Sequence, residues 1–157
     1  MTENRYTRTT HWYLLRTKYN QESKAAKELQ QQGIDVFLPI HKVEKIIKSK
    51  KTIKKEPLFS RYIFVQLDFE KINWTSIRST RGVSNYVEFG RGPAIVAQAI
   101  IEELEKIDSL APKPYYKIGQ KLRIRSGALK GLKAIYDAPD GTSRSYLLLT
   151  FMQQNQR

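Results

Sequence analysis

The alternation of apolar and polar positions predicts a series of short strands and helices over the first two thirds of the chain. The apolar and aromatic stretch 11–17 predicts a strand. The segment 20–32 predicts a helix, with Asn20 as its N-cap and Gly33 as its end. Further strands are predicted at 35–38, 61–68 and 83–89, and further helices at 71–79 and 98–108. The last helix is amphipathic, because its apolar side chains recur at helical spacing.

The segment 42–55 predicts a β-hairpin that turns near Ser49 and Lys50. Its few apolar contacts come from Val43, Ile46, Ile47 and Ile53, and Glu44 is its single acidic residue. The basic residues are Lys42, Lys45, Lys48, Lys50, Lys51, Lys54 and Lys55. The hairpin is therefore a concentrated source of positive charge.

The predicted order β-α-β-β-β-β-α-β-α indicates an α+β fold, in which helices pack against a mostly antiparallel sheet. Residues 1–10 show no periodicity and predict a flexible N-terminal arm, so the first domain is expected at 11–108. The segment 109–114 contains two prolines and predicts a linker. Acidic residues are frequent before it, whereas only Asp137 and Asp140 follow it. We therefore expect a second, small domain at 115–157.

The pattern of this second domain is compatible with two secondary structures. Leu122 and Ile124, followed by a glycine-containing turn, indicate a β-hairpin, with 146–151 as a further strand. Gly127 and Gly131 would each cost about 1 kcal/mol in a helix. Helical spacing is nevertheless present as well, at Leu122, Ser126, Leu129, Leu132 or Lys133, and Tyr136, with 137–141 as a loop between two helices. Such ambiguity is what two competing packings of one segment require.

The charge of the chain points to a polyanionic partner. Lys and Arg number 28 against 15 Asp and Glu, which gives a net charge of +13. Nucleic acid is the first expectation, because no basic amphipathic helix that would bind a membrane carries the charge. A merely soluble, lysine-rich surface is the alternative. No cysteine is present, which excludes disulfides and thiolate metal sites, and no segment resembles a signal peptide, so we expect a cytoplasmic protein.

Catalytic chemistry has little support in the sequence. His11 and His41 are the only histidines, and neither belongs to a set with the spacing of metal ligands. No glycine-rich phosphate loop follows a predicted strand. The acidic run Glu102, Glu103 and Glu105 lies on the amphipathic helix and is interpreted as its solvated face. We expect that the protein is not an enzyme and needs no cofactor.

Six short motifs, in order along the chain, resemble the NusG family of transcription elongation factors. They cover roughly residues 11–151, and the first three match the N-terminal domain of that family. These are Trp12-Tyr13, the EPLF of 56–59 running into the YIFV of 62–65, and the TRGVS of 80–84. PAIV at 93–96, PDG at 139–141 and the RS and LLL of 144–149 are most similar to its specialised RfaH branch. The segments 118–122 and 127–131 resemble the family's C-terminal KOW module.

The resemblance implies a function in transcription. Such proteins bind the clamp helices and gate loop of RNA polymerase and suppress pausing and termination. The specialised branch acts on particular operons, because a specific element in the exposed non-template DNA strand recruits it. Its KOW domain masks the polymerase site as an α-helical hairpin, and on release becomes a β-barrel that can bind the small subunit of the ribosome. By this resemblance the protein is a monomer with no membrane partner.

The resemblance also implies site residues. Basic side chains would neutralise phosphates, and two polar ones would reach bases. The DNA-binding set is Lys18, Gln21, Lys24, Lys48, Lys50, Arg78, Thr80 and Arg81. The polymerase-binding set is Phe59, Tyr62, Phe64, Ile101 and Leu104 at the clamp helices, with Asn73 and Thr75 at the gate loop. Glu56 and Arg144 stand where the branch has an interdomain ion pair.

Some positions leave alternatives open. Tyr62 and Phe64 share one face of their predicted strand and Ile63 and Val65 share the other, so one pair can be core while the other is not. Trp74 is either a core residue or part of the gate-loop contact. Glu28 and Gln31 stand where the branch has a basic DNA-binding pair. Two alternatives are a general NusG-like factor without autoinhibition and a KOW-type ribosomal or RNA-binding protein.

Overall fold

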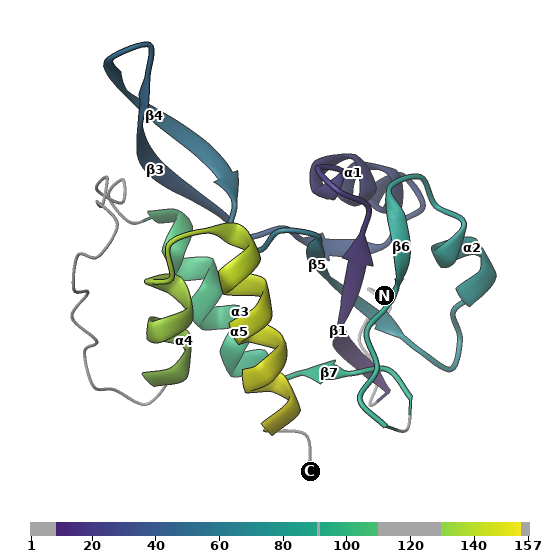
Figure 1. Ribbon diagram of the computed structural model, residues 1–157. Helices are drawn as coiled ribbons and strands as arrows, with labels where there is room; N and C mark the ends of the chain where they lie inside the picture. Colours follow the sequence, from purple (N-terminus) through teal and green to yellow (C-terminus); the bar gives the residue numbers. More distant parts are fainter. Residues whose placement is uncertain (1–8, 91, 110–129, 155–157) are drawn as a thin grey trace, which may run out of the picture. The chain divides into compact units, whose positions relative to one another are not determined.

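The computed structural model describes residues 9–90, 92–109 and 130–154 (Figure 1). Most of the predicted N-terminal arm, most of the predicted linker, and the possible KOW strand around Leu122 and Ile124 lie outside the described residues. The described chain forms two compact units. We call residues 9–38 and 61–98 the sheet unit, and residues 39–60, 99–109 and 130–154 the hairpin unit.

The sheet unit is built on an antiparallel sheet with strand order β2-β5-β1-β6, with β7 also paired to β1. Its elements are β1 (Thr10–Thr17), α1 (Glu22–Gln31), β2 (Asp35–Phe37), β5 (Tyr62–Asp68), α2 (Trp74–Arg78), β6 (Val83–Tyr86) and β7 (Ile95–Val96). The strands predicted at 11–17, 35–38 and 61–68 are present within a residue of their expected bounds. The helix predicted at 71–79 and the strand predicted at 83–89 are shorter than expected, and β7 was not anticipated.

The two faces of the sheet carry different side chains. Ile63 and Val65 of β5 pair with Leu15 and Tyr13 of β1, and all four belong to the main hydrophobic core with Ala25, Leu29 and Ile77 of the helices. Phe64, between them, pairs with Leu14 and with Phe37 and points to the opposite face. It is also fully buried. Burial of each large side chain contributes about 1.5–3 kcal/mol, so the sheet is stabilised on both faces.

Helix α1 ends as predicted but begins differently. At its C-terminus Gly33 has φ +82°, and its N–H donates to Gln30 O while that of Ile34 donates to Leu29 O, which is the Schellman arrangement. At its N-terminus the prediction of Asn20 as N-cap was wrong. Asn20 has φ +57° and belongs to the preceding turn, and Gln21 occupies the cap position without a side-chain capping bond.

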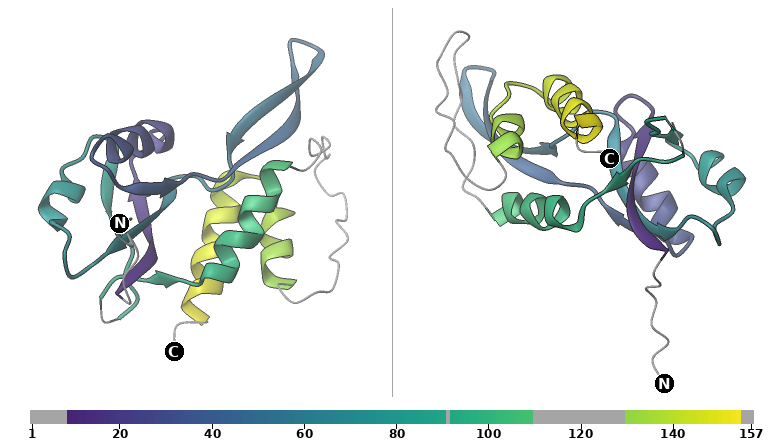
Figure 2. Two further views of the ribbon diagram at one scale, coloured as in Figure 1. Left: turned by 180° about the vertical axis from the view of Figure 1, so that it is seen from behind. Right: turned by 90° about the horizontal axis from the view of Figure 1, so that it is seen from below.

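The hairpin unit combines a two-stranded ribbon with helices (Figure 2). Its elements are β3 (Ile40–Ile47), β4 (Lys50–Pro57), α3 (Gln98–Glu105, whose first residue belongs to the sheet unit), a 3₁₀ turn η1 (Lys106–Ser109), α4 (Lys130–Tyr136) and α5 (Gly141–Gln154). Strands β3 and β4 pair without interruption from Ile40 opposite Pro57 to Ile47 opposite Lys50. The two-residue loop is Lys48 and Ser49, one residue earlier than expected, and both have positive φ, as a tight hairpin turn requires.

Residues 130–136 and 141–154 are helical in this structure, so 146–151 is part of a helix. The loop between α4 and α5 ends at Asp140, which is the N-cap of α5: its Oδ1 accepts from the N–H of Ser143 at 2.7 Å. Leu132, Ile135, Leu148 and Met152 of the two helices are buried. Among the described residues no helix is long and apolar enough to cross a membrane.

Candidate nucleic-acid surface and buried arginine cluster

Three turns of the sheet unit are joined by main-chain hydrogen bonds. The N–H of Lys18 donates to Gly82 O at 2.8 Å, and that of Thr17 donates to Arg61 O at 2.7 Å. These bonds bring the β1–α1 turn, the α2–β6 turn and the start of β5 together. Exposed basic side chains of this part of the unit are Arg16, Lys18, Lys24, Arg61, Arg78 and Arg81. Four of the eight expected DNA-binding residues are among them.

Gly82 makes this arrangement possible. Its φ is +89°, and a Cβ placed on it would lie 3.0 Å from the main-chain nitrogen of Ala25 and 3.1 Å from the Cβ of that residue. A residue other than glycine would therefore push the turn away from α1. The close approach holds Arg81 near the start of the helix.

The two polar residues expected to reach bases are placed differently from each other. Gln21 is half-buried at the start of α1. Thr80 is buried, its hydroxyl donates to Ser76 O at 2.9 Å, and it accepts from Nε2 of Gln32 at 2.8 Å. With both roles of its hydroxyl engaged, Thr80 holds the α2–β6 turn in this conformation rather than presenting a polar group to solvent.

Asn73 and Thr75, expected at the gate loop, lie at the start of α2. Oδ1 of Asn73 accepts from the N–H of Thr75 at 3.1 Å and from that of Ser76 at 3.4 Å, so Asn73 is the N-cap, while Thr75 is exposed. Trp74 packs on Phe69 and Tyr86, with ring centroids 4.6 and 4.7 Å apart. Of the two alternatives for Trp74, this packing favours the core.

The remaining DNA-binding candidates, Lys48 and Lys50, lie at the tip of the hairpin and belong to the hairpin unit. Both are exposed, as is most of β4. Ile46 and Ile53 near the tip are exposed as well. The ribbon thus presents lysines on both faces with few apolar contacts of its own.

The candidates for the clamp helices divide between the units. Phe59, Ile101 and Leu104 belong to the hairpin unit, with α4 and α5, and all three are buried. In the sheet unit Tyr62 is half-buried and Phe64 is fully buried. None of the four buried residues presents a side chain to solvent in this conformation.

Arg144 of α5 is the largest fully buried side chain of the described chain, at 2% exposure. Its Nε donates to Leu58 O at 2.5 Å and its Nη1 donates to Ala138 O at 3.0 Å. Its Nη2 lies 3.0 Å from Nε2 of His41 and 3.7 Å from Oε1 of Glu56. Oε2 of Glu56 pairs with Nζ of Lys45 at 2.6 Å. Arg144 therefore ties α5 to both strands of the hairpin and to the segment after it.

The neighbouring Ser145 adds to this attachment. Its hydroxyl lies 2.7 Å from Ser60 O and 2.9 Å from Gly141 O, and the N–H of Ser60 donates to Gly141 O. Together with Arg144, these bonds fix the first turn of α5 against 58–60.

The charged groups of the cluster shift each other's protonation. Burial raises the pKa of Glu56, but the hydrogen bond from Lys45 and the charges of Lys45, His41 and Arg144 outweigh it, so the pKa lies below its ordinary value. Burial lowers the pKa of Arg144, against the attraction of Glu56, Asp140 and Tyr136. The guanidinium still keeps its proton at neutral pH.

His41 and Lys45 were not expected in this cluster. The signal for His41 was present in the hairpin itself, because a loop at Lys48 and Ser49 places His41 directly opposite Glu56. Lys45 lies four residues after His41 in β3, on the same face of the strand. The two main-chain acceptors of Arg144 carry no signal in the sequence.

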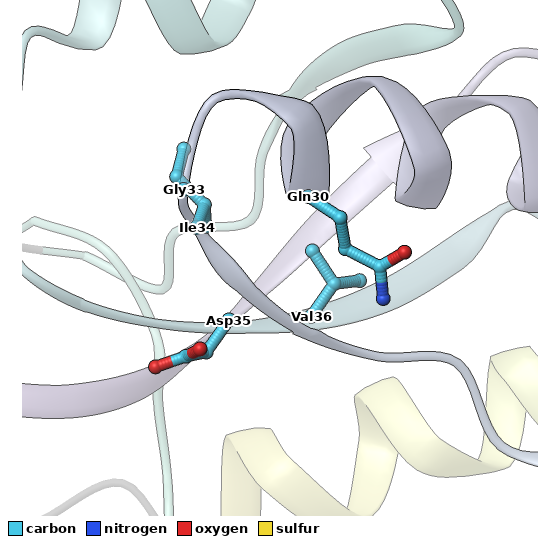
Figure 3. A pocket seen from close by; sticks show the side chains of 5 residues that line it. All are labelled: Gln30, Gly33, Ile34, Asp35 and Val36. Carbon is cyan, nitrogen blue, oxygen red and sulfur yellow. The ribbon is translucent and has the colours of Figure 1, made fainter.

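A shallow pocket of about 270 Å³ lies where α1 turns into β2 (Figure 3). It is lined by Gln30, Gly33, Ile34, Asp35 and Val36. Figure 3 shows Gln30 and Val36 beside each other and Asp35 turned away, so the pocket brings no pair of acid–base groups together. In the described part of the chain, no group of three or more His, Asp or Glu side chains is placed to hold a metal ion.

Comparison with known proteins identifies the family. The family model described as transcription termination factor nusG matches residues 10–105. The transcription termination/antitermination protein NusG of Helicobacter pylori is 24% identical over 151 residues, covering 87% of this chain and 86% of that protein. The NusG of Thermus thermophilus is 28% identical over 138 residues, with 74% and 75% covered. A solved structure titled "Domain interaction in Thermotoga maritima NusG" is similar with a TM-score of 0.48 and 20% identity, covering 75% of this chain and 67% of that one. The family match spans more than half of the sequence, and the chain belongs to the NusG family.

Proposed function

We propose that this protein is an operon-specific transcription elongation and antitermination factor of the RfaH kind. It binds the clamp helices and gate loop of RNA polymerase and the exposed non-template DNA strand, and it suppresses pausing and termination. Helices α4 and α5 hold it in an inactive state until a DNA element recruits it. After release, its KOW domain contacts the small subunit of the ribosome.

The observation that carries the proposal is the buried Arg144 cluster. One side chain of α5 binds two main-chain carbonyls and lies beside His41 and Glu56 of the hairpin. Removing one partner from a buried ionic cluster costs about 3–5 kcal/mol, because the other partner is left uncompensated. Such a cluster is strong enough to hold α5 in place, and its contacts would all be lost together when α5 is released.

Burial of the clamp candidates supports autoinhibition. Phe59, Ile101 and Leu104 lie in one compact unit with α4 and α5 and have almost no exposed surface. Release of the two helices would expose this apolar set, and large exposed apolar patches typically mark protein interaction sites. In this proposal, opening and polymerase binding are the same event.

The basic turns of the sheet unit support the DNA contact. Lys18, Lys24, Arg78 and Arg81 neutralise phosphates of the displaced strand, and the lysines of the hairpin add charge. Gln21 is the candidate for a base contact. Thr80 acts by holding the turn that carries Arg81.

A general NusG-like factor without autoinhibition is the second candidate. The names of the relatives favour it, since the proteins of Helicobacter pylori and Thermus thermophilus are both called transcription termination/antitermination protein NusG. It predicts action on every template, with no dependence on the sequence of the non-template strand.

A pause assay on stalled elongation complexes separates the two candidates. Templates that differ only in the exposed non-template strand are tested with the wild-type protein and with Glu56→Ala, which removes the carboxylate that faces His41, Lys45 and Arg144. We expect the wild type to suppress pausing on one template class and the variant to act on all of them. Equal action of the wild type on every template would favour the general factor, and no binding to elongation complexes would overturn both.

A further inference from the structure

Tyr19 is unusual among the aromatic residues of the sheet unit because its ring is open to solvent. Its side chain is 65% exposed, whereas Tyr13 and Phe64 are buried. It lies in the turn between β1 and α1, next to Lys18. An exposed aromatic ring on a turn does not contribute to the core, so packing does not explain why an aromatic residue stands at this position.

The guanidinium of Arg61 lies over this ring, with its Cζ 5.3 Å from the ring centroid. This is within the range of a cation–π contact. Arg61 is itself exposed, so the contact leaves surface of both groups open to a further flat molecule. Tyr19 and Arg61 come from distant parts of the chain and meet only in the folded sheet unit.

Both residues stand on backbone that hydrogen bonds hold in place. The turn of Tyr19 is closed by the Lys18 N–H to Gly82 O and by the Gln21 N–H to Lys18 O at 3.1 Å. Arg61 has φ +69°, and its N–H donates to Oε1 of Glu22 at 2.9 Å while its carbonyl accepts from Thr17. Glu22 is buried, and this bond to Arg61 gives its carboxylate a function. A ring and a guanidinium on fixed turns lose little conformational freedom on binding.

The charge around the pair selects the kind of ligand. Arg16 and Lys18 shortly precede Tyr19 in the chain, and the Lys18 turn is bonded to the turn of Arg81. Lys24 and Arg78 are exposed on the adjacent helices. Proteins that bind single strands combine such a basic surface with aromatic rings on which bases stack.

We propose that Tyr19 and Arg61 form a stacking platform for an unpaired base of single-stranded DNA. The surrounding basic side chains hold the phosphates on either side, and the platform takes the base by its flat face. Stacking of this kind tolerates any base, so it increases the affinity for single-stranded DNA without making binding sequence-specific. This inference rests on the proposed function, because it assigns a contact within the proposed DNA-binding surface.

Binding of the full chain to a fluorescent dT decamer, and to the same backbone without bases, tests the platform. Tyr19→Ala should weaken binding to the decamer by roughly 5- to 150-fold, as expected for one lost stack. Binding to the baseless strand should stay unchanged, and Tyr19→Phe should bind like the wild type. The dependence of binding on salt should be the same in all variants, because no phosphate contact is altered.

Tyr146→Ala is the matched control, since Tyr146 is 71% exposed on α5 and has no place in the platform. It should change neither affinity. Unchanged affinity of Tyr19→Ala, an equal loss on the baseless strand, or a Tyr19-dependent preference for an rU decamer would each overturn the platform. If the wild type itself shows no salt-dependent binding to either strand, the proposed DNA contact fails as a whole, which is a different result.

Discussion

The guanidinium of Arg144 and the imidazole of His41 meet at 3.0 Å in the interior of the hairpin unit. The atoms that meet are Nη2 of Arg144 and Nε2 of His41, and the tautomer of the histidine ring decides whether they share a hydrogen bond. Oε1 of Glu56 lies 3.3 Å from the same nitrogen. The histidine ring thus stands between a fixed cation and a carboxylate, and His41 and Glu56 both face Arg144.

Replacing Arg144 should therefore loosen α5. In Arg144→Met the volume is largely kept, while the donors to Leu58 O and Ala138 O are lost. We expect a cost of about 3–5 kcal/mol, the usual result of removing one partner from a buried ionic cluster. Hydrogen exchange of the amides of 141–154 should become faster by a corresponding factor.

The control for this variant is Lys106→Met. Lys106 pairs with Glu103 at 2.9 Å on the surface of the same unit, and an exposed pair is worth only about 0–1 kcal/mol. Its removal should leave exchange in α5 unchanged. Protection of α5 that survives Arg144→Met would show that the hydrogen bonds of Ser145 and the apolar packing of Leu148 and Met152 hold the helix without Arg144.

Acid should weaken the same attachment. The pKa of Glu56 is lowered from its ordinary value of 4.5. Burial raises this pKa, but the larger combined effect of Lys45, His41 and Arg144 lowers it. The pKa of Asp140 is lowered from 3.8, first by the hydrogen bond from the N–H of Ser143. A carboxyl with a depressed folded-state pKa contributes stability above its unfolded value and loses it as pH falls through the folded value. The stability that these two carboxylates contribute should thus be constant from pH 7 to about 5 and decrease below about 4.5.

Melting curves recorded between pH 7 and 3 measure this dependence. Glu56→Gln should be less stable than the wild type at pH 7, and the difference between the two should shrink as pH falls. A constant difference across the whole range would mean that the charge of Glu56 does not stabilise the fold.

The strands could be predicted because their signal is local. The segments that form β1 and β5 are rich in apolar, aromatic and β-branched residues, which is enough to predict strands, whereas the pairing of Leu15 with Ile63 is seen only in the folded sheet. Strand β7 is two residues long and exists because Ile95 and Val96 pair with β1, which no local pattern announces. Asn20 has a good N-cap residue type, yet the bond between Lys18 and Gly82 places it in a turn. Tertiary contacts decided both cases.

The site could be predicted in its residue types more than in its contacts. Arg144 and Glu56 were named from the resemblance, but the nearest partners of Arg144 are the carbonyls of Leu58 and Ala138 and the ring of His41. Every residue has a main-chain carbonyl, so the residue types in a sequence cannot show which carbonyl accepts a hydrogen bond. The contact of Thr80 could not be predicted either. Its hydroxyl accepts a hydrogen bond from Gln32, which is far away in the sequence, and the motif around Thr80 does not reveal this partner.

Specific phosphate contacts should be separable from bulk charge. The double variant Lys18→Ala and Arg81→Ala removes two cations from turns that share a hydrogen bond. For single strands the logarithm of affinity falls with the logarithm of salt by about 0.7 per neutralised phosphate, so the slope should decrease by about 1.4. Fluorescence anisotropy of a labelled oligonucleotide over a salt series gives the slope.

The comparison for that experiment is the double variant Lys71→Ala and Lys106→Ala. It removes the same net charge from two exposed lysines that pair with Asp68 and Glu103. Its slope should match that of the wild type. Equal decreases in both double variants would mean that net charge alone, and not a defined surface, attracts DNA.

Two glycines with similar backbone angles should respond differently to the same substitution. Gly33 has φ +82° and Gly82 has φ +89°, so alanine at either position adopts a left-handed conformation at a cost of about 1–2 kcal/mol. Around Gly33 nothing lies within 4 Å of an added Cβ. At Gly82 that Cβ would meet the main chain of Ala25 at 3.0 Å, in the middle of a buried helix face that cannot move cheaply.

Gly33→Ala should therefore cost about 1–2 kcal/mol, and Gly82→Ala about 2–4 kcal/mol, as measured by urea unfolding. The second variant should also weaken DNA binding, even in buffer where it is fully folded. The reason is that a displaced Gly82 takes Arg81 with it and disturbs the carbonyl that accepts from the N–H of Lys18. Gly33→Ala, at the far end of α1, should bind DNA like the wild type. If the two variants were equally stable and bound DNA equally well, the close approach of Gly82 to Ala25 would have no part in shaping the basic surface.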